Sequence, residues 1–346
     1  MPIIAYLVRV STLSLIDVAA GARRVYNGRH LIFGPHFTYR EGTLNIATPL
    51  ETDPASWVNT VIRDALHDPT LNTLQNPSNE RAWADPLVGF SRGDDLLYEQ
   101  YKEYVGPFHW TPVEAFAAAF PGVAIGPDEL TVISWVLPQT KATREDNRKQ
   151  TVYPAERWAR SRVYGEEAND KLRQRLVEAL LQQGRQAVAP VLAPGWKSMR
   201  SDWYVFSSMW SERHVAYASG LGTFGLCDGL ITAAGKAVRL GSVVVRMQIP
   251  STQRPYSDRH AYCLFFSERT DAGTGRARSH ACGKCMDRCP AGAITEAGHD
   301  KDKCRQFTSH TTVEYIRSHY GFNGYGCGLC QTGVPCECKI PTTQDI

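Results

Sequence analysis

A nearly continuous run of apolar and β-branched residues over 130–137 is the clearest strand signal in the chain. The run reads LTVISWVL and is ended by Pro138, which is typical of a strand buried on both faces. Residues 187–192 predict a further strand. Residues 229–232 and 237–247 predict two more, and the short sequence AAGK between them favours a hairpin.

The strongest helical pattern lies over residues 166–183. Apolar residues recur on one face with helical spacing, and Gly184 stands where a C-terminal cap belongs. Residues 211–219 predict a shorter helix with Ser211 as its N-cap. Helices and strands therefore share one α/β unit.

The chain divides into three parts by composition. Residues 1–120 indicate mixed helices and loops, and residues 121–255 carry the predicted strands and helices. After Pro250 the sequence becomes rich in Cys, Gly, Arg and Asp, with little aliphatic periodicity. Residues 256–346 are therefore predicted to form a domain organised by metal rather than by an apolar core.

Composition and charge exclude several classes of protein. The 346 residues are 43% hydrophobic and 21% charged, as in an ordinary globular protein, and the net charge of +3 does not by itself indicate nucleic-acid binding. No secretory signal is visible, and the longest clean apolar stretch is far too short to span a bilayer. We therefore expect a soluble cytoplasmic protein without a membrane partner.

Positive charge is concentrated in residues 139–200, which hold thirteen Lys and Arg against seven Asp and Glu. Two interpretations remain open. The segment is either a solvated basic helix face or a surface for an anionic ligand such as RNA or a phosphate-bearing cofactor. Interleaved aromatic residues are compatible with RNA.

Cysteines point to the chemistry, because nine of the ten lie between Cys263 and Cys338. The sequence CGKCMDRCP over residues 282–290 is the second half of a bacterial ferredoxin run, C-x2-C-x3-C-P, in which the cysteine before proline ligates the other of two clusters. Eight thiolates would hold two [4Fe–4S] clusters. The chain is therefore predicted to move electrons.

The ferredoxin run is incomplete, because Ser279 occupies the position of its first cysteine. The crossed ligand pattern of ferredoxins then predicts two sets of ligands. The first cluster takes Cys263, Cys282, Cys285 and Cys336, and the second takes Cys289, Cys304, Cys327 and Cys330.

Several alternatives stay open for these cysteines. Cys338 competes with Cys336, and Cys263 could be a buried bystander. Paired C-x2-C elements also suit zinc sites built from four thiolates. Cys227 lies outside the group and is interpreted as a lone buried thiol rather than a reactive or ligating one.

A glycine-rich stretch, GLGTFG over residues 220–225, satisfies the dinucleotide pattern G-x-G-x-x-G. That fingerprint must follow a strand and open a helix. Here a helix precedes the glycines and strands follow, so the dinucleotide interpretation is declined. The glycines are better explained by a tight turn or by close passage of the backbone past something flat or bulky.

The order of these motifs resembles the epoxyqueuosine reductases and their relatives, the cobalamin-dependent reductive dehalogenases. Those families carry an E-R-x-x-A helix and then A-G-L-G, which appear here as ERHVA from Glu212 and SGLG from Ser219. The C-x2-C-x3-C-P run and Y-G-C-x2-C-Q over residues 325–331 follow in the same order. The resemblance covers roughly residues 125–346.

The resemblance implies an α+β fold, with a nitroreductase-like cobalamin-binding core and a C-terminal ferredoxin-like double [4Fe–4S] domain. It implies an iron–sulfur enzyme that reductively cleaves a bond in a small or nucleoside-like substrate. Electrons would come from an external flavodoxin or ferredoxin type donor. Cobalamin would lie near the glycine-rich stretch, formed by Gly220, Leu221, Gly222, Thr223, Phe224 and Gly225.

Three departures from the family pattern favour a substrate other than epoxyqueuosine in tRNA. Phe206 stands where those enzymes place a proton-donating Asp, and Ala168-Asn169 replaces a Tyr-His pair. Five residues separate Cys330 from Cys336 where three are usual.

A reductive cleavage needs a general acid, and the sequence offers Glu212, His214 and Tyr164. Each also has a structural interpretation: Glu212 could only cap its helix, for example. Two other functions remain: an electron-transfer protein without its own substrate, and a zinc-stabilised RNA-binding protein.

Overall fold

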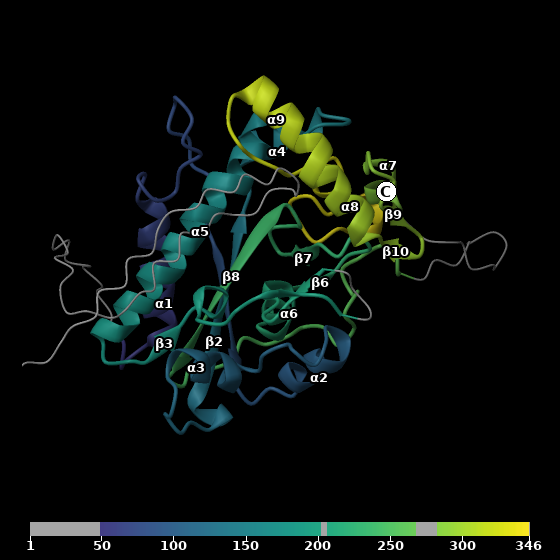
Figure 1. The fold of residues 1–346 in the computed structure, drawn as a ribbon. Coiled ribbons are helices and arrows are strands. Elements are labelled where there is room, and N and C mark those ends of the chain that lie inside the picture. The colour runs from purple at the N-terminus through teal and green to yellow at the C-terminus, as the bar shows by residue number, and fades with distance from the viewer. Residues whose placement is uncertain (1–48, 202–205, 268–281, 346) are drawn as a thin grey trace, which may run out of the picture. The chain divides into compact units, whose positions relative to one another are not determined.

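The computed structural model describes residues 49–201, 206–267 and 282–345. Its centre is an antiparallel sheet with strand order β1-β2-β8-β3 (Figure 1). The strands are β1 (Leu87–Arg92), β2 (Leu130–Pro138), β8 (Val238–Arg246) and β3 (Ala187–Val188). The predicted mixed α/β architecture is confirmed at this level. The specific nitroreductase-like and ferredoxin-like assignments stay predictions.

Strand β2 is buried along its whole length, which explains its continuous apolar sequence. Ile133 and Trp135 face α1 (Pro54–His67) and α5 (Glu156–Gln182), where one apolar cluster forms. Val132 lies in a second cluster on the other face. That face is covered by α2 (Leu97–Tyr104), α3 (Pro112–Ala119) and α6 (Glu212–Ala218).

Gly241 on β8 makes room for the largest side chain of the sheet. It is paired with Trp135 on β2. A Cβ atom at Gly241 would lie 2.5 Å from the Trp135 indole. The indole Nε1 donates to Asn169 Oδ1 on α5 at 2.9 Å, which ties the helix to the sheet.

The predicted hairpin between residues 229–232 and 237–247 is wrong. Strand β7 (Leu230–Thr232) pairs with β6 (Gly222–Phe224), whereas β8 pairs with β2 and β3. Gly222 permits this pairing, because a Cβ atom there would lie 2.2 Å from the Ile231 carbonyl oxygen. The strand that pairs with β7 is therefore determined by contacts far from the AAGK segment in the sequence and not by that segment.

Other predicted elements differ in extent. The helix predicted over 166–183 is α5, which begins ten residues earlier, at Glu156. The strand predicted over 187–192 is β3 followed by a 3-10 turn, Pro190–Leu192, because Pro190 has no N–H to donate to a ladder. The boundary predicted at residue 120 falls in the connection between β1 and β2, which pair along the length of β1, and the domain division stays a prediction.

The cysteine-rich part consists of short elements. They include α7 (Lys284–Asp287), β9 (Ile294–Thr295), β10 (Gly298–His299), α8 (Lys301–Gln306), a π-helical turn (Phe307–Thr311) and α9 (Thr312–Tyr320). Helix α4 (Lys141–Arg148) belongs to the core and borders this part. A two-stranded ribbon of β4 (Ser198–Met199) and β5 (Ser207–Ser208) lies elsewhere in the chain. Among the helices of the described ranges, none combines the length and apolarity needed to cross a membrane.

Candidate metal centre and its surroundings

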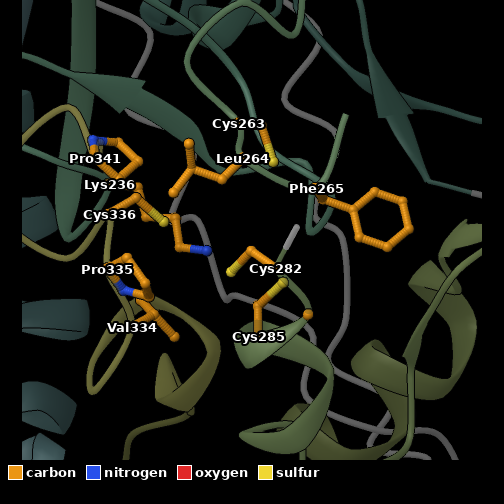
Figure 2. Close-up of a pocket in the computed structure, with 11 residues that line it drawn as sticks. Lys236, Cys263, Leu264, Phe265, Cys282, Cys285, Val334, Pro335, Cys336 and Pro341 are labelled. Carbon is orange, nitrogen blue, oxygen red and sulfur yellow. The ribbon is translucent and has the colours of Figure 1, made fainter. Parts of the chain in front are cut away.

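The structure brings the first predicted set of ligands together around one pocket (Figure 2). Cys285 lies in α7 and Cys282 lies just before this helix, whereas Cys336 lies on the opposite side of the pocket. Cys263 lines the pocket from a third segment. Four thiols that are far apart in the sequence thus face one space, as the ligands of a polynuclear cluster would.

A buried lysine projects into the same pocket. Lys236 is 3% exposed, and its Nζ donates to Cys227 Sγ at 3.3 Å. Burial opposes charge on Lys236, but the neighbouring Cys227, Cys336 and Cys285 thiolates hold the pKa of the ammonium well above its ordinary value. A buried ammonium needs anionic partners, and a thiolate-ligated iron–sulfur cluster is such a partner. The residues therefore fit that group.

Cys227 is part of this constellation, contrary to its interpretation as a lone thiol. Its sulfur is hydrogen-bonded with the thiols of Cys285 and Cys330. These hydrogen bonds, together with the charge of Lys236, hold the pKa of Cys227 well below its ordinary value. The sequence offered two signals for this role: the absent cysteine at position 279 and a cysteine directly after the glycine-rich stretch.

The members of the second predicted set of ligands interact with one another electrostatically. Cys327 lies within electrostatic range of Cys304 and Cys289, and Cys330 within range of Cys327. Burial raises the pKa of Cys327 to about 12. Such a thiol stays protonated at neutral pH unless a bound cation stabilises its thiolate, and bound iron would do so. Among the described residues, no three Cys, His or carboxylate side chains converge as ligands of a single metal ion.

His299 provides a charged neighbour for the second set. Burial opposes its protonation, but hydrogen bonds with Asp228 and Cys304 raise the pKa of His299 to about 9. The Nδ1 of His299 lies 3.3 Å from Asp228 Oδ2. Since Asp228 follows Cys227 directly, the turn that carries Cys227 is anchored to the cysteine-rich segment.

Core helices hold both cysteine runs in place. Asn147 at the end of α4 donates to Thr332 Oγ1 at 3.1 Å, and the Arg288 guanidinium donates to the carbonyl oxygens of Asn147 and Gln150. Gly328 lies directly on the α5 indole of Trp158, where a Cβ atom would be 1.9 Å from the ring. The turn between Cys327 and Cys330 therefore fits only with glycine at position 328.

Glu212 lies in a closed ion network rather than at an open site. Its Oε1 accepts from Arg173 at 3.1 Å, and its Oε2 accepts from Ser242 Oγ at 2.6 Å. Arg173 also contacts Asp170 and Glu166. Burial raises the pKa of Glu212, and Arg173 opposes the rise. With both oxygens occupied by protein donors, Glu212 has a structural explanation.

His214 and Tyr164 have contacts that differ from those of Glu212. The Nδ1 of His214 is 2.8 Å from Ser211 Oγ, and its ring packs on Tyr101 and Phe224. Burial lowers the pKa of His214 to about 3, so this imidazole is neutral at pH 7. Tyr164 packs on Phe322. Glu212 and His214 share α6 and Tyr164 lies on α5, and their catalytic role stays a prediction.

The glycine-rich stretch is covered by the chain itself. A Cβ atom at Gly220 would lie 2.7 Å from the Gln253 carbonyl oxygen, and Gly222 is equally close to β7. Thr223 is fully buried, and its Oγ1 accepts from the Tyr262 amide at 3.0 Å. These contacts account for the glycines without a cofactor. Leu221, Gly222, Thr223 and Gly225 are buried, so this stretch itself presents little surface to a corrin ring.

Ion pairs within the chain neutralise much of the basic segment. Arg148 pairs with Glu337 at 2.6 Å, Arg175 with Asp68 at 3.3 Å, and Arg173 lies in the network described above. Carboxylates brought from other parts of the fold thus meet these cations. This arrangement favours the structural interpretation of the charge excess over an RNA surface.

Phe206, at the position of the family's Asp, is 47% exposed. The guanidinium carbon of Arg305 on α8 lies 4.9 Å from its ring centroid. An apolar ring under a cation cannot donate a proton, so the departure seen in the sequence is also a departure in local chemistry.

No protein-family model matches the chain. Over 130 residues it is 31% identical to epoxyqueuosine reductase of Bacillus anthracis, which covers 36% of this chain and 29% of the relative. The corresponding Bacillus cereus protein is 30% identical over 130 residues, with the same coverage. The chain thus spans less than a third of the length of these curated relatives.

Solved structures that align with this chain share little sequence with it and have low TM-scores. A selenomethionine-labelled epoxyqueuosine reductase aligns with a TM-score of 0.40 at 16% identity, covering 83% of this chain and 70% of the other. A catabolic reductive dehalogenase aligns with a TM-score of 0.41 at 14% identity, covering 84% and 38%. The resemblance to epoxyqueuosine reductases that the motifs predict is confirmed by the sequence match over 130 residues.

Proposed function

We propose that this protein is an iron–sulfur reductase that passes electrons through two [4Fe–4S] clusters to the reductive cleavage of a bond in a small or nucleoside-like substrate. The gathering of Cys263, Cys282, Cys285 and Cys336 around the buried Lys236 supports this proposal most strongly. The similarity to epoxyqueuosine reductases over 130 residues supports the reductive chemistry and the nucleoside-like substrate.

The proposed chemistry assigns distinct tasks to the two sets of cysteines. One cluster is held by Cys289, Cys304, Cys327 and Cys330. The other is held by Cys282, Cys285, Cys336 and a fourth thiolate, which the sequence assigns to Cys263. Each cluster carries one electron at a time, so two transfers from a flavodoxin or ferredoxin type donor, together with a proton, complete one cleavage.

Metal analysis tests the proposal directly. The full chain, purified without oxygen or reconstituted with iron and sulfide, should be brown and contain about eight iron and eight sulfide per chain. A colourless protein that carries zinc would contradict the proposal. Hydroxocobalamin that remains with the protein through gel filtration would add cobalamin, and a protein that binds none would favour an electron carrier.

A further inference from the structure

The first cluster site contains one thiol more than four-fold ligation requires. Cys263, Cys282, Cys285 and Cys336 line its pocket, and Cys227 lies behind the lining residues, beside Cys285 and in one buried cluster with it. Cys227 is 5% exposed and precedes β7, so it belongs to the sheet-bearing part of the protein rather than to the cysteine-rich segment. One of the five thiols is therefore not a ligand.

The turn that carries Cys227 is rigid and directs the thiol inward. Gly225 N–H donates to the Gly229 carbonyl at 2.8 Å, and Asp228 N–H donates to the Gly225 carbonyl at 2.9 Å. Asp228 adopts a left-handed φ of 58° and contacts Lys301 and His299 of the cysteine-rich segment. This closed turn fixes the position of Cys227 from both sides.

The neighbours of the Cys227 sulfur are those of a ligand. The sulfur contacts Cys285 of the first set and Cys330 of the second set, and it accepts the hydrogen bond from Lys236. Amine and amide donors to ligating sulfur are a known means by which proteins tune iron–sulfur clusters. Among the described residues, no carboxylate lies within ion-pairing distance of Lys236, so its charge is directed at sulfur alone.

Cys263 has different surroundings. It is only partly buried, and its sulfur accepts from the backbone amides of Leu226 and Phe265. Phe265 belongs to the same loop as Cys263, whereas Leu226 directly precedes Cys227 in the chain. The Cys263 sulfur also receives no contact from the Lys236 ammonium like that at Cys227.

We propose that Cys227 is the fourth iron ligand of the first cluster and replaces the ferredoxin cysteine that is absent at position 279. The inference rests on the proposed iron–sulfur function and changes one ligand of it, since the sequence assigns that place to Cys263. It makes the cluster a covalent link between the turn that joins β6 to β7 and the cysteine-rich segment. Lys236 then donates to a ligating sulfur.

Iron and sulfide content of the reconstituted full chain tests the ligand. Cys227→Ala should lose about half of the iron, whereas the matched variant Cys263→Ala should keep it all. Full iron in Cys227→Ala, or an equal loss in Cys263→Ala, would overturn the assignment. A wild-type chain that binds no iron would instead refute the proposed function.

A rescue variant separates ligand loss from misfolding. Ser279 lies outside the described residues, but the ferredoxin spacing makes it the natural ligand position. In the double variant Cys227→Ala/Ser279→Cys, the iron content should return to that of the wild type. Electron paramagnetic resonance of the reduced protein should then again show two interacting clusters. Failure of the rescue, with the double variant folded by circular dichroism, would count against Cys227 as the ligand.

Discussion

Two buried cations of this protein have opposite surroundings. Arg173, 2% exposed, meets the carboxylates of Glu166, Asp170 and Glu212. Lys236, 3% exposed, meets only sulfur within the described part of the chain. Both cations are removed from water on folding, but only Arg173 has carboxylate partners that replace the lost hydration.

The contrast separates structure from function. The Arg173 network is electrically closed, since burial would raise the pKa of Glu166 yet Arg239, Arg173 and Arg162 lower it to about 2. Such a network needs no ligand. The surroundings of Lys236 lack fixed negative charge, so they are completed only by deprotonated thiols, which is what iron binding produces.

Removing Arg173 should have the largest effect. Arg173→Met leaves Glu212 buried without its cation and removes one of the cations around Glu166, and we expect a loss of about 3–5 kcal/mol in the free energy of unfolding. Urea denaturation measures it. The control is Arg81→Met, whose ion pair with Asp85 is exposed and should contribute less than about 1 kcal/mol. Equal effects would show that the network is not structural.

Gly235→Ala should specifically disturb the thiol site around Lys236. Gly235 has a φ of +78°, and a Cβ atom there would lie 2.3 Å from the Cys338 amide nitrogen. We expect a cost of about 1–3 kcal/mol and reduced iron content, because Cys336 would be displaced. Gly122→Ala is the matched control, since Gly122 has a φ of +83° and nothing within 4 Å. Iron loss in both variants would refute the steric explanation.

Two buried histidines differ from both cations, because each of them stays neutral at pH 7. Burial lowers the pKa of His109 to about 4 and that of His214 to about 3, against about 6.5 in an unfolded chain. Between these values only the unfolded chain binds the protons. Stability should therefore be complete above about pH 6.5 and fall toward pH 4, by up to about 1.4 kcal/mol per pH unit for each histidine.

Urea denaturation across this pH range measures the slope. His109→Gln should flatten it, whereas the exposed His67 should tolerate the same substitution without effect on the slope. A slope that His109→Gln leaves unchanged would assign the acid sensitivity to other groups.

Lys236→Met should have the smallest effect on folding and a distinct effect on redox behaviour. Without metal, removing a buried charge that lacks a carboxylate should change the free energy of unfolding by roughly 1 kcal/mol or less. With the clusters present, loss of the cation should lower the reduction potential, since less positive charge stabilises the added electron. Potentiometric titration compares it with Lys284→Met, whose side chain is 61% exposed. Equal potentials in the two variants would remove Lys236 from the cluster's surroundings.

Local sequence patterns predicted the local features of this molecule. The apolar run that became β2, the helix around Leu172 and the C-terminal cysteines all depend on residues close together in the chain. The partners of β7, Glu212 and Cys227 depend on residues far apart. Arg173 neutralises Glu212 across the interior, and Cys285 reaches Cys227 only after the chain has folded. Spacing alone could not reveal such pairs.

The backbone contact beside the pocket has a consequence for how the protein is made. Lys236 N–H donates to the Cys336 carbonyl at 2.8 Å, and Ala237 N–H donates to that of Glu337 at 3.2 Å. During synthesis the strand after Ala237 emerges well before Cys336. The contacts of Lys236 and Cys227 with the later cysteines can therefore form only after those cysteines have been synthesised. The proposed first cluster could therefore be completed only after Cys336 has been synthesised, about a hundred residues after the lysine beside it.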